Sequence, residues 1–314
     1  MRKLFVTGAI VFFGVVAPVG ALATGASAGA SVTRNANLAA TTHSLSSALA
    51  GSVSTTIQHL VGPLSGERVL GVHKAGLTYT ATAQSTNWSG YVDTSDTFQT
   101  ISSSWTQPTV TCKAGSGGGG GLLGGLLGGA SGSSAYSSFW VGLDGYTSKS
   151  VEQTGTDSDC TSSGTPSYYA WYEMYPAGSI QLSTATYPVK PGDVMTGSVT
   201  SSPSASTFTM TLTDNTAHWV FTFTASSSGL ARSSAEWVAE APSECNFLFC
   251  SQLPLADFGT VAFSNAVVTN TAGASGPISK FNNVAVQMAS GGTVEATPSF
   301  LNAAGNGFSV AWNS

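Results

Sequence analysis

Three parts of the sequence combine tryptophan and tyrosine with carboxylate and amide side chains, which are residue types that can bind and hydrolyse a polymer. They read SFWVGLDG (138–145) followed by VEQTGT (151–156), YAWYEMYP (169–176) and SAEWVAEAP (234–242). Each part predicts a strand, and alternate side chains of a strand lie on the same face of a sheet. One such strand is explained by aromatic packing alone, but three together favour an open binding surface.

The alternation predicts which side chains share a face. Trp140 lies with Asp144, and Trp171 lies with Glu173 and Tyr175. In the third part, Glu236, Val238 and Glu240 share one face. Gln153 is expected to point away from its neighbour Glu152.

Other catalytic chemistries fit this chain poorly. Only His218 follows residue 82, and a Ser-His-Asp hydrolase needs a positioned histidine. The single G-x-S-x-G motif, Gly25–Gly29, lies outside any strand-to-helix turn. The remaining chemistry is that of carboxylate and amide groups acting through a water molecule.

The four cysteines predict two disulfides in an exported protein. Cys245 and Cys250 are close in sequence and favour a local bridge, which leaves Cys112 for Cys160. The spacing fits no zinc-finger pattern, so we expect no metal and no other cofactor.

The chain divides into three parts. Residues 1–28 have a basic start, an apolar run and A-x-A sites, which is typical of a secretory signal peptide. Residues 29–81, called here the N-terminal segment, contain neither Cys nor Trp and predict a propeptide. Residues 82–314 form the expected catalytic domain, with a glycine-rich surface loop at 113–134.

From Thr86 onward the pattern is that of short strands separated by turns. STFTMTLTD alternates apolar and threonine side chains, and HWVFTFTAS, GTVAFSNAVVTN, NNVAVQMAS and GFSVAWNS follow the same rule. The pattern predicts one all-β domain, an antiparallel sandwich or barrel.

Charge is distributed unevenly along the chain. Five Lys and Arg residues stand against one carboxylate before residue 82, and five stand against fourteen carboxylates after it. The acidic body argues against a nucleic-acid partner. No second apolar stretch of spanning length follows, so we expect a secreted protein with no membrane attachment after signal cleavage. We also expect a monomer. The scarcity of lysine suits a protein that must stay folded in an acidic medium.

The motifs as a set resemble the glutamic peptidases, or eqolisins. The matching parts are NWSGY (87–91), WVGLDG (140–145), EQTG (152–155), W-Y-E-x-Y-P (171–176) and A-E-x-x-x-E (235–240), which ends at Glu240. The resemblance implies a sandwich of two large antiparallel sheets, concanavalin A-like or of jelly-roll type. It also implies a catalytic pair formed by Glu240 and Gln153 and protein or peptide substrates. The position and charge of the N-terminal segment predict a further partner, a propeptide that keeps the enzyme inactive until export.

We assign substrate binding to other residues of the same motifs: Trp88, Trp140, Asp144, Trp171, Glu173 and Tyr175. Two alternatives stay open at this stage. One is a lectin-like sandwich with tryptophans as sugar platforms, and the other is a glycosidase that uses two carboxylates, such as Glu173 and Glu240.

Overall fold

The computed structural model describes residues 59–60, 63–65, 68–75, 78–112, 133–245 and 250–313. The expected signal peptide, most of the N-terminal segment and residues 113–132 of the glycine-rich loop lie outside these ranges. No helix in the described ranges is long and apolar enough to span a membrane.

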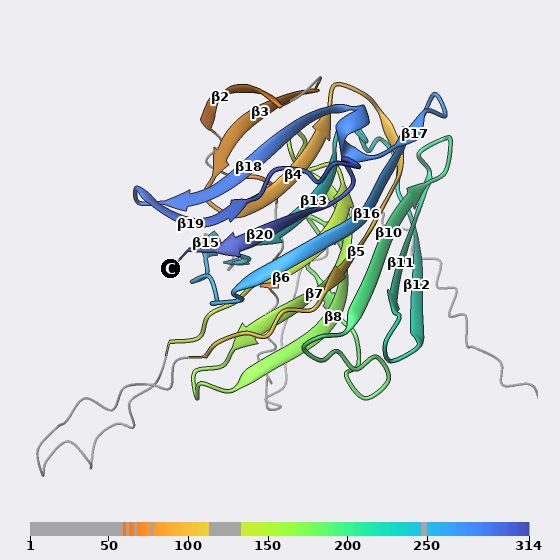
Figure 1. Ribbon diagram of the computed structural model, residues 1–314. Helices are drawn as coiled ribbons and strands as arrows, with labels where there is room; N and C mark the ends of the chain where they lie inside the picture. The colour runs from red at the N-terminus through yellow and green to blue at the C-terminus, as the bar shows by residue number, and fades with distance from the viewer. Residues whose placement is uncertain are drawn as a thin grey trace, which may run out of the picture. The chain divides into compact units, whose positions relative to one another are not determined.

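The described residues form an antiparallel β-sandwich, which confirms the predicted fold class (Figure 1). Only one short 3-10 helix, η2 (Ile278–Lys280), accompanies the strands in this part of the chain. The strands are β1 (His59–Leu60), β2 (Arg68–Ala75), β3 (Thr78–Ser85), β4 (Trp88–Thr94), β5 (Phe98–Thr106), β6 (Ser138–Leu143), β7 (Val151–Cys160), β8 (Pro166–Tyr175), β9 (Ile180–Gln181), β10 (Val194–Ser201), β11 (Thr207–Asp214), β12 (Trp219–Ser226), β13 (Ala235–Glu240), β14 (Ser243–Cys245), β15 (Cys250–Gln252), β16 (Thr260–Asn270), β17 (Ser275–Gly276), β18 (Asn282–Ser290), β19 (Thr293–Pro298) and β20 (Phe308–Trp312).

Strand pairing defines two layers. One layer runs β2-β3-β18-β4-β13-β6-β7-β8-β9, and we call it the site sheet. The other runs β19-β20-β16-β5-β10-β11-β12, and the β18–β19 pairing joins the two. Within these layers only β3 and β18 pair in parallel. The layers therefore form a sandwich built almost wholly from antiparallel ladders.

The core lies between the two layers and follows the predicted alternation. Tyr91, Val141 and Trp237 of the site sheet pack in one buried cluster with Phe208 and Leu212 of β11. A second buried cluster lies on the opposite face of the site sheet. Its members are Ala83, Trp88, Val92, Trp140, Val151, Trp171, Val238, Val284 and Val286, and we call it the tryptophan cluster.

The strands begin earlier in the chain than the sequence pattern indicates. The prediction placed the first strand after Thr86, whereas β2 and β3 form a hairpin that pairs with β18 through β3. The expected boundary at residue 82 therefore falls within β3. Alternation alone missed this hairpin because its pairing partner, β18, lies some 200 residues further along the chain.

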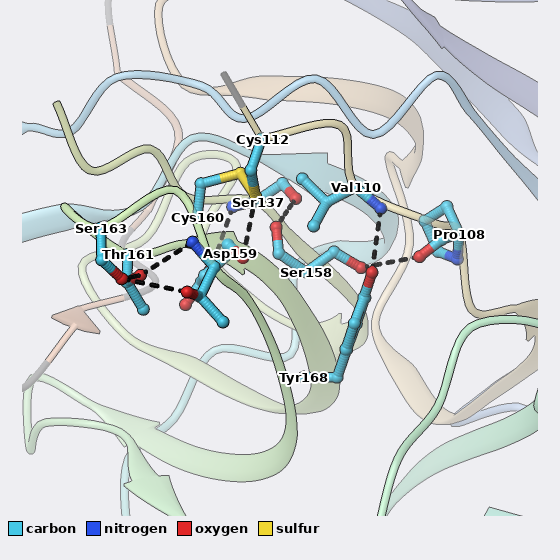
Figure 2. Close-up of a disulfide and its surroundings, with 11 residues drawn as sticks. Pro108, Val110, Cys112, Ser137, Ser158, Asp159, Cys160, Thr161, Ser163 and Tyr168 are labelled. Atoms are coloured by element: carbon cyan, nitrogen blue, oxygen red, sulfur yellow. Dashed lines mark hydrogen bonds between the residues drawn. A yellow bond between two sulfur atoms is a disulfide. The ribbon is translucent and has the colours of Figure 1, made fainter. Parts of the chain in front are cut away.

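The disulfide between Cys112 and Cys160 is present as predicted (Figure 2). It holds the end of β7 to the segment after β5, where the Tyr168 hydroxyl accepts a hydrogen bond from the backbone N–H of Val110 at 3.2 Å. Cys250 is also disulfide-bonded and lies opposite Cys245 in the β14–β15 pairing. The side chain of Cys245 is outside the described part of the structure.

Replacing Cys112 and Cys160 together by alanine should destabilise the protein strongly. The bridge closes a loop across a sequence separation of 48 residues, and the chain-entropy model gives about 4 kcal/mol for such a loop. Chemical denaturation of the double variant should show a loss approaching that value. An unfolding free energy equal to that of the wild type would contradict a stabilising role for the bridge.

Candidate active site

Glu240 and Gln153 lie on the same face of the site sheet. Glu240 is opposite Ser138 in β6 and Trp88 in β4. Gln153 is opposite Gly142 in β6 and Glu173 in β8. Directly opposed residues share a face, and Ser138 and Gly142 are separated by an even number of positions. The face is that of the tryptophan cluster.

Two hydrogen bonds fix the carboxylate of Glu240. Asn87 Nδ2 donates to Oε1 at 3.1 Å, and the indole Nε1 of Trp140 donates to Oε2 at 3.0 Å. The Glu240 side chain is fully buried. A buried carboxyl group needs such partners, and these two donors also set its orientation.

Glu173 orients the amide of Gln153. Gln153 Nε2 donates a hydrogen bond to Glu173 Oε2 at 3.0 Å, and both side chains are buried. Glu152 projects toward the inter-sheet core, because its partners Leu143 and Met174 pack there. Glu152 and Gln153 therefore point to opposite faces of the site sheet, as predicted.

The tryptophans named from the sequence gather on this face. Trp88 meets Trp140 edge to face, with ring centroids 5.0 Å apart, and Trp171 belongs to the same cluster. Tyr175 packs against that cluster and is partly buried. All three indoles are almost fully buried, so the face that carries Glu240 and Gln153 is packed with aromatic side chains.

Asp144 has a different environment from the other proposed binding residues. It has a φ of 70° just after β6, and it is fully buried. Its oxygens accept hydrogen bonds from the backbone N–H groups of Arg232 at 2.7 Å and Ser233 at 2.8 Å. These bonds hold the segment before β13 in place.

Sequence reasoning did not assign a role to Asn87, and it missed Asp157, Asp159 and Tyr169. Asp157 lies two alternations from Gln153 on β7, and its Oδ1 accepts the indole N–H of Trp171 at 2.6 Å. The Tyr169 hydroxyl oxygen lies 2.8 Å from Asp157 Oδ2 and 2.9 Å from Asp159 Oδ2. A hydroxyl has one proton, so one of these contacts uses a proton from a carboxyl group. Burial and the charge of Asp157 raise the pKa of Asp159 well above its usual range.

Three further carboxyl groups lie buried near Asp144, at the far end of β13. Burial alone raises the pKa of Asp93, whose oxygens have no hydrogen-bond partner among the described residues. Burial, then the negative charge of Asp144, raises the pKa of Glu152. For Glu236, burial also raises the pKa, and the Ser234 hydroxyl partly opposes it. Burial therefore favours the neutral form of all three groups in the folded protein.

A polar cavity of about 590 Å³ lies at the end of β4 and β6. It is lined by Thr94, Ser95, Asp96, Thr97, Tyr146, Thr147 and Ser233. Tyr146 also packs on the tryptophan cluster, so this cavity adjoins the candidate site. Within the described residues no three His, Cys, Asp or Glu side chains gather so that they could hold a metal ion.

Comparison with known proteins identifies the family. The model of the Peptidase A4 family matches residues 86–306, which is more than half of the chain. The chain belongs to the peptidase A4 family. It is therefore a glutamic peptidase, a hydrolase of peptide bonds, and the resemblance drawn from the motifs is confirmed.

Individual members of this family are similar to the chain over its described domain. Aspergillopepsin-2 of Aspergillus niger is 34% identical over 200 residues, which cover 62% of this chain and 67% of that protein. Scytalidopepsin B of Scytalidium lignicola is 32% identical over 196 residues, covering 60% and 65% respectively. The crystal structure of scytalido-glutamic peptidase with a transition state analog inhibitor aligns with a TM-score of 0.58 and 27% identity. That alignment covers 73% of this chain and 98% of the peptidase. Family membership favours a peptidase over the lectin-like and glycosidase alternatives.

The buried carboxyl groups make stability dependent on pH. Free Asp and Glu titrate near pH 4, whereas Asp93, Glu152 and Glu236 keep their protons to higher pH when folded. The folded state then binds more protons, so the free energy of unfolding falls as pH rises from about 4 through the folded-state pKa values. Asp93→Asn should make this fall shallower. The difference from wild type should grow by about 1.4 kcal/mol for each pH unit over which Asp93 stays protonated.

Denaturant titrations at several pH values between 4 and 8 measure this effect. Glu244→Gln is the matched control, because Glu244 is exposed and should leave the slope unchanged. Parallel stability curves for wild type and Asp93→Asn would show that Asp93 does not contribute to the loss.

Proposed function

We propose that this chain is a secreted endopeptidase that acts in acid, with Glu240 and Gln153 as its catalytic pair. The observation that carries the proposal is the fixed carboxylate of Glu240, held by Asn87 and Trp140 on the face that also carries Gln153. The motifs of the family supply the same assignment from the sequence.

In the proposed reaction, Glu240 removes a proton from a water molecule placed against the scissile carbonyl. The hydroxide forms a bond to the carbonyl carbon, and Gln153 donates an N–H to the developing oxyanion. Protonated Glu240 then gives its proton to the leaving nitrogen as the C–N bond breaks. Only Glu240, Gln153, the water molecule and the substrate take part in these steps, so the proposal includes neither a metal nor a covalent intermediate.

Glu173 has a positioning task in this scheme. An amide nitrogen carries two hydrogens, and Glu173 accepts one of them from Gln153. The scheme assigns the second to the oxyanion. A fixed donor costs little reorganisation when charge develops, which is why such donors are effective.

Secretion and acid activity have separate support. The first 28 residues read as a signal peptide, and free glutamate titrates at about pH 4.3, where a base-then-acid cycle is efficient. The neutral buried acids described above suit the same medium, because a folded state that binds more protons is most stable in acid.

Substitution of the pair tests the mechanism directly. Glu240→Gln should abolish hydrolysis, because it removes the base, and Gln153→Ala should lower kcat on the order of a hundredfold or more. Glu152→Gln is the matched control: it is adjacent, buried and expected to be neutral when folded. Activity is measured on a denatured protein at acidic pH. Equal losses at residues 152 and 153 would contradict the assignment.

The N-terminal segment is proposed to be removed by the enzyme itself in acid. The segment has an excess of cations, while the domain after it is acidic. Below about pH 4 the carboxylates of the domain become protonated, so the attraction between the two parts weakens. Cleavage is expected within residues 74–86.

Incubation of the purified full chain at acidic pH measures this processing. Wild type should shorten with time, and Glu240→Gln should stay intact when no other protease is added. If Glu240→Gln matures as fast as wild type, self-processing is wrong and another protease, or none, does this work.

A further inference from the structure

Part of the N-terminal segment lies directly against the candidate site. β1 pairs with β14, which begins three residues after Glu240. Residues 63–65 then contact Asn87 and Gly145, and the chain continues into the β2–β3 hairpin at the edge of the site sheet. The segment therefore contacts both β14, which follows Glu240 in the chain, and Asn87, which donates a hydrogen bond to Glu240.

Residues 63–65 are held by their backbone. The carbonyl of Pro63 accepts a hydrogen bond from Asn87 Nδ2 at 3.2 Å, and the N–H of Leu64 donates to the carbonyl of Gly145 at 3.1 Å. The N–H of Ser65 donates to Asn87 Oδ1 at 2.9 Å, and its carbonyl accepts from the N–H of Thr86 at 2.9 Å. Bonds to successive backbone groups hold an extended peptide of any sequence, as in recognition by strand addition.

Asn87 connects this contact with Glu240. One amide hydrogen of Asn87 goes to Glu240 Oε1 and the other to the Pro63 carbonyl. An amide nitrogen has only two hydrogens, so the group that orients the carboxylate also binds the peptide backbone. A peptide bound in this way lies next to the catalytic carboxylate.

The side chain of Leu64 supplies the apolar part of the contact. It packs against the tryptophan cluster and is partly buried. Its backbone partner Gly145 adjoins Trp88 and Val151, because a Cβ added at Gly145 would come within 3.0 Å of each of these side chains. Leu64 therefore lies beside the tryptophan cluster.

We propose that Pro63–Ser65 occupies the substrate cleft as an internal pseudosubstrate, and that Leu64 marks a subsite for an aliphatic side chain of the substrate. This inference rests on the proposed function. Asn87 binds both the Pro63 carbonyl and Glu240, so a substrate placed beside Glu240 and residues 63–65 compete for one place. The backbone clamp accepts peptides generally, and the Leu64 subsite selects among them.

A peptide added in trans tests the subsite without catalysis. The probe is a fluorescently labelled peptide of residues 60–67, LVGPLSGE. The host is the full chain with Glu240→Gln, which prevents processing, and with Leu64→Asp, which weakens its own occupant. We expect this host to bind the probe at least about tenfold more tightly than a host with Glu240→Gln alone. A probe with aspartate in place of leucine should bind about tenfold or more weakly.

Two further host variants serve as controls. Val220→Asp adds the same carboxylate at an exposed position of β12 and should leave probe binding as in Glu240→Gln alone. Leu64→Ala is a milder change that should give an intermediate gain if Leu64→Asp does not fold. Equal affinity for the leucine and aspartate probes overturns the subsite.

The cleavage pattern of the wild type separates this inference from the proposed function. After acid incubation, the full chain should cut a denatured protein with leucine-like residues enriched at one fixed position from the cleaved bond. Cleavage without such enrichment overturns the subsite alone. Absence of cleavage, whatever the probe does, overturns the proposed function and the pseudosubstrate with it.

Discussion

Strand β13 lies between β4 and β6, and its register with both determines where Glu240 lies. All six of its residues are buried, so each side chain must find a partner on one face or the other. Trp237 enters the inter-sheet core, and Val238 joins the tryptophan cluster. A shift of register by one residue would exchange these faces and move Glu240 away from Asn87 and Trp140. The packing of the apolar residues therefore positions the polar one.

The same strand explains why the site is built from amide and indole donors. A carboxylate inside a sheet has no access to bulk water and needs hydrogen bonds from nearby groups. Asn87, directly before β4, and Trp140, within β6, provide them. Neither donor carries a net charge, so the two hydrogen bonds orient the carboxyl group without forming an ion pair. An arginine or lysine there would hold the carboxylate in an ion pair and make it a poorer base.

The sequence predicted the fold and the shared faces of its strands better than the contacts between distant strands. Alternation in β11 and β12 and the aromatic motifs of β6, β8 and β13 sufficed for an all-β sandwich and for one face carrying Gln153 and Glu240. The alternation did not predict the surroundings of Asp144. This residue obeys the alternation of β6, yet the chain turns at a φ of 70° and its carboxylate binds Arg232 and Ser233. Asn87 was visible only as part of a motif, because its hydrogen bonds to Ser65 and Glu240 join residues 22 and 153 positions away. Such long-range contacts depend on strand order, which periodicity does not encode.

Strand β13 carries a buried carboxyl group near each end, and the two groups have different surroundings. Glu236 is surrounded by Asp93, Asp144 and Glu152, so burial and negative neighbours favour its neutral form. Glu240, four residues further on, instead receives an N–H donor on each oxygen. The difference arises from the partners that β4 and β6 present at each register position, since the strand and the degree of burial are the same. The register of β13 against β4 and β6 therefore places a carboxyl group whose neutral form burial favours four residues from the one to which the proposed mechanism assigns the proton transfer.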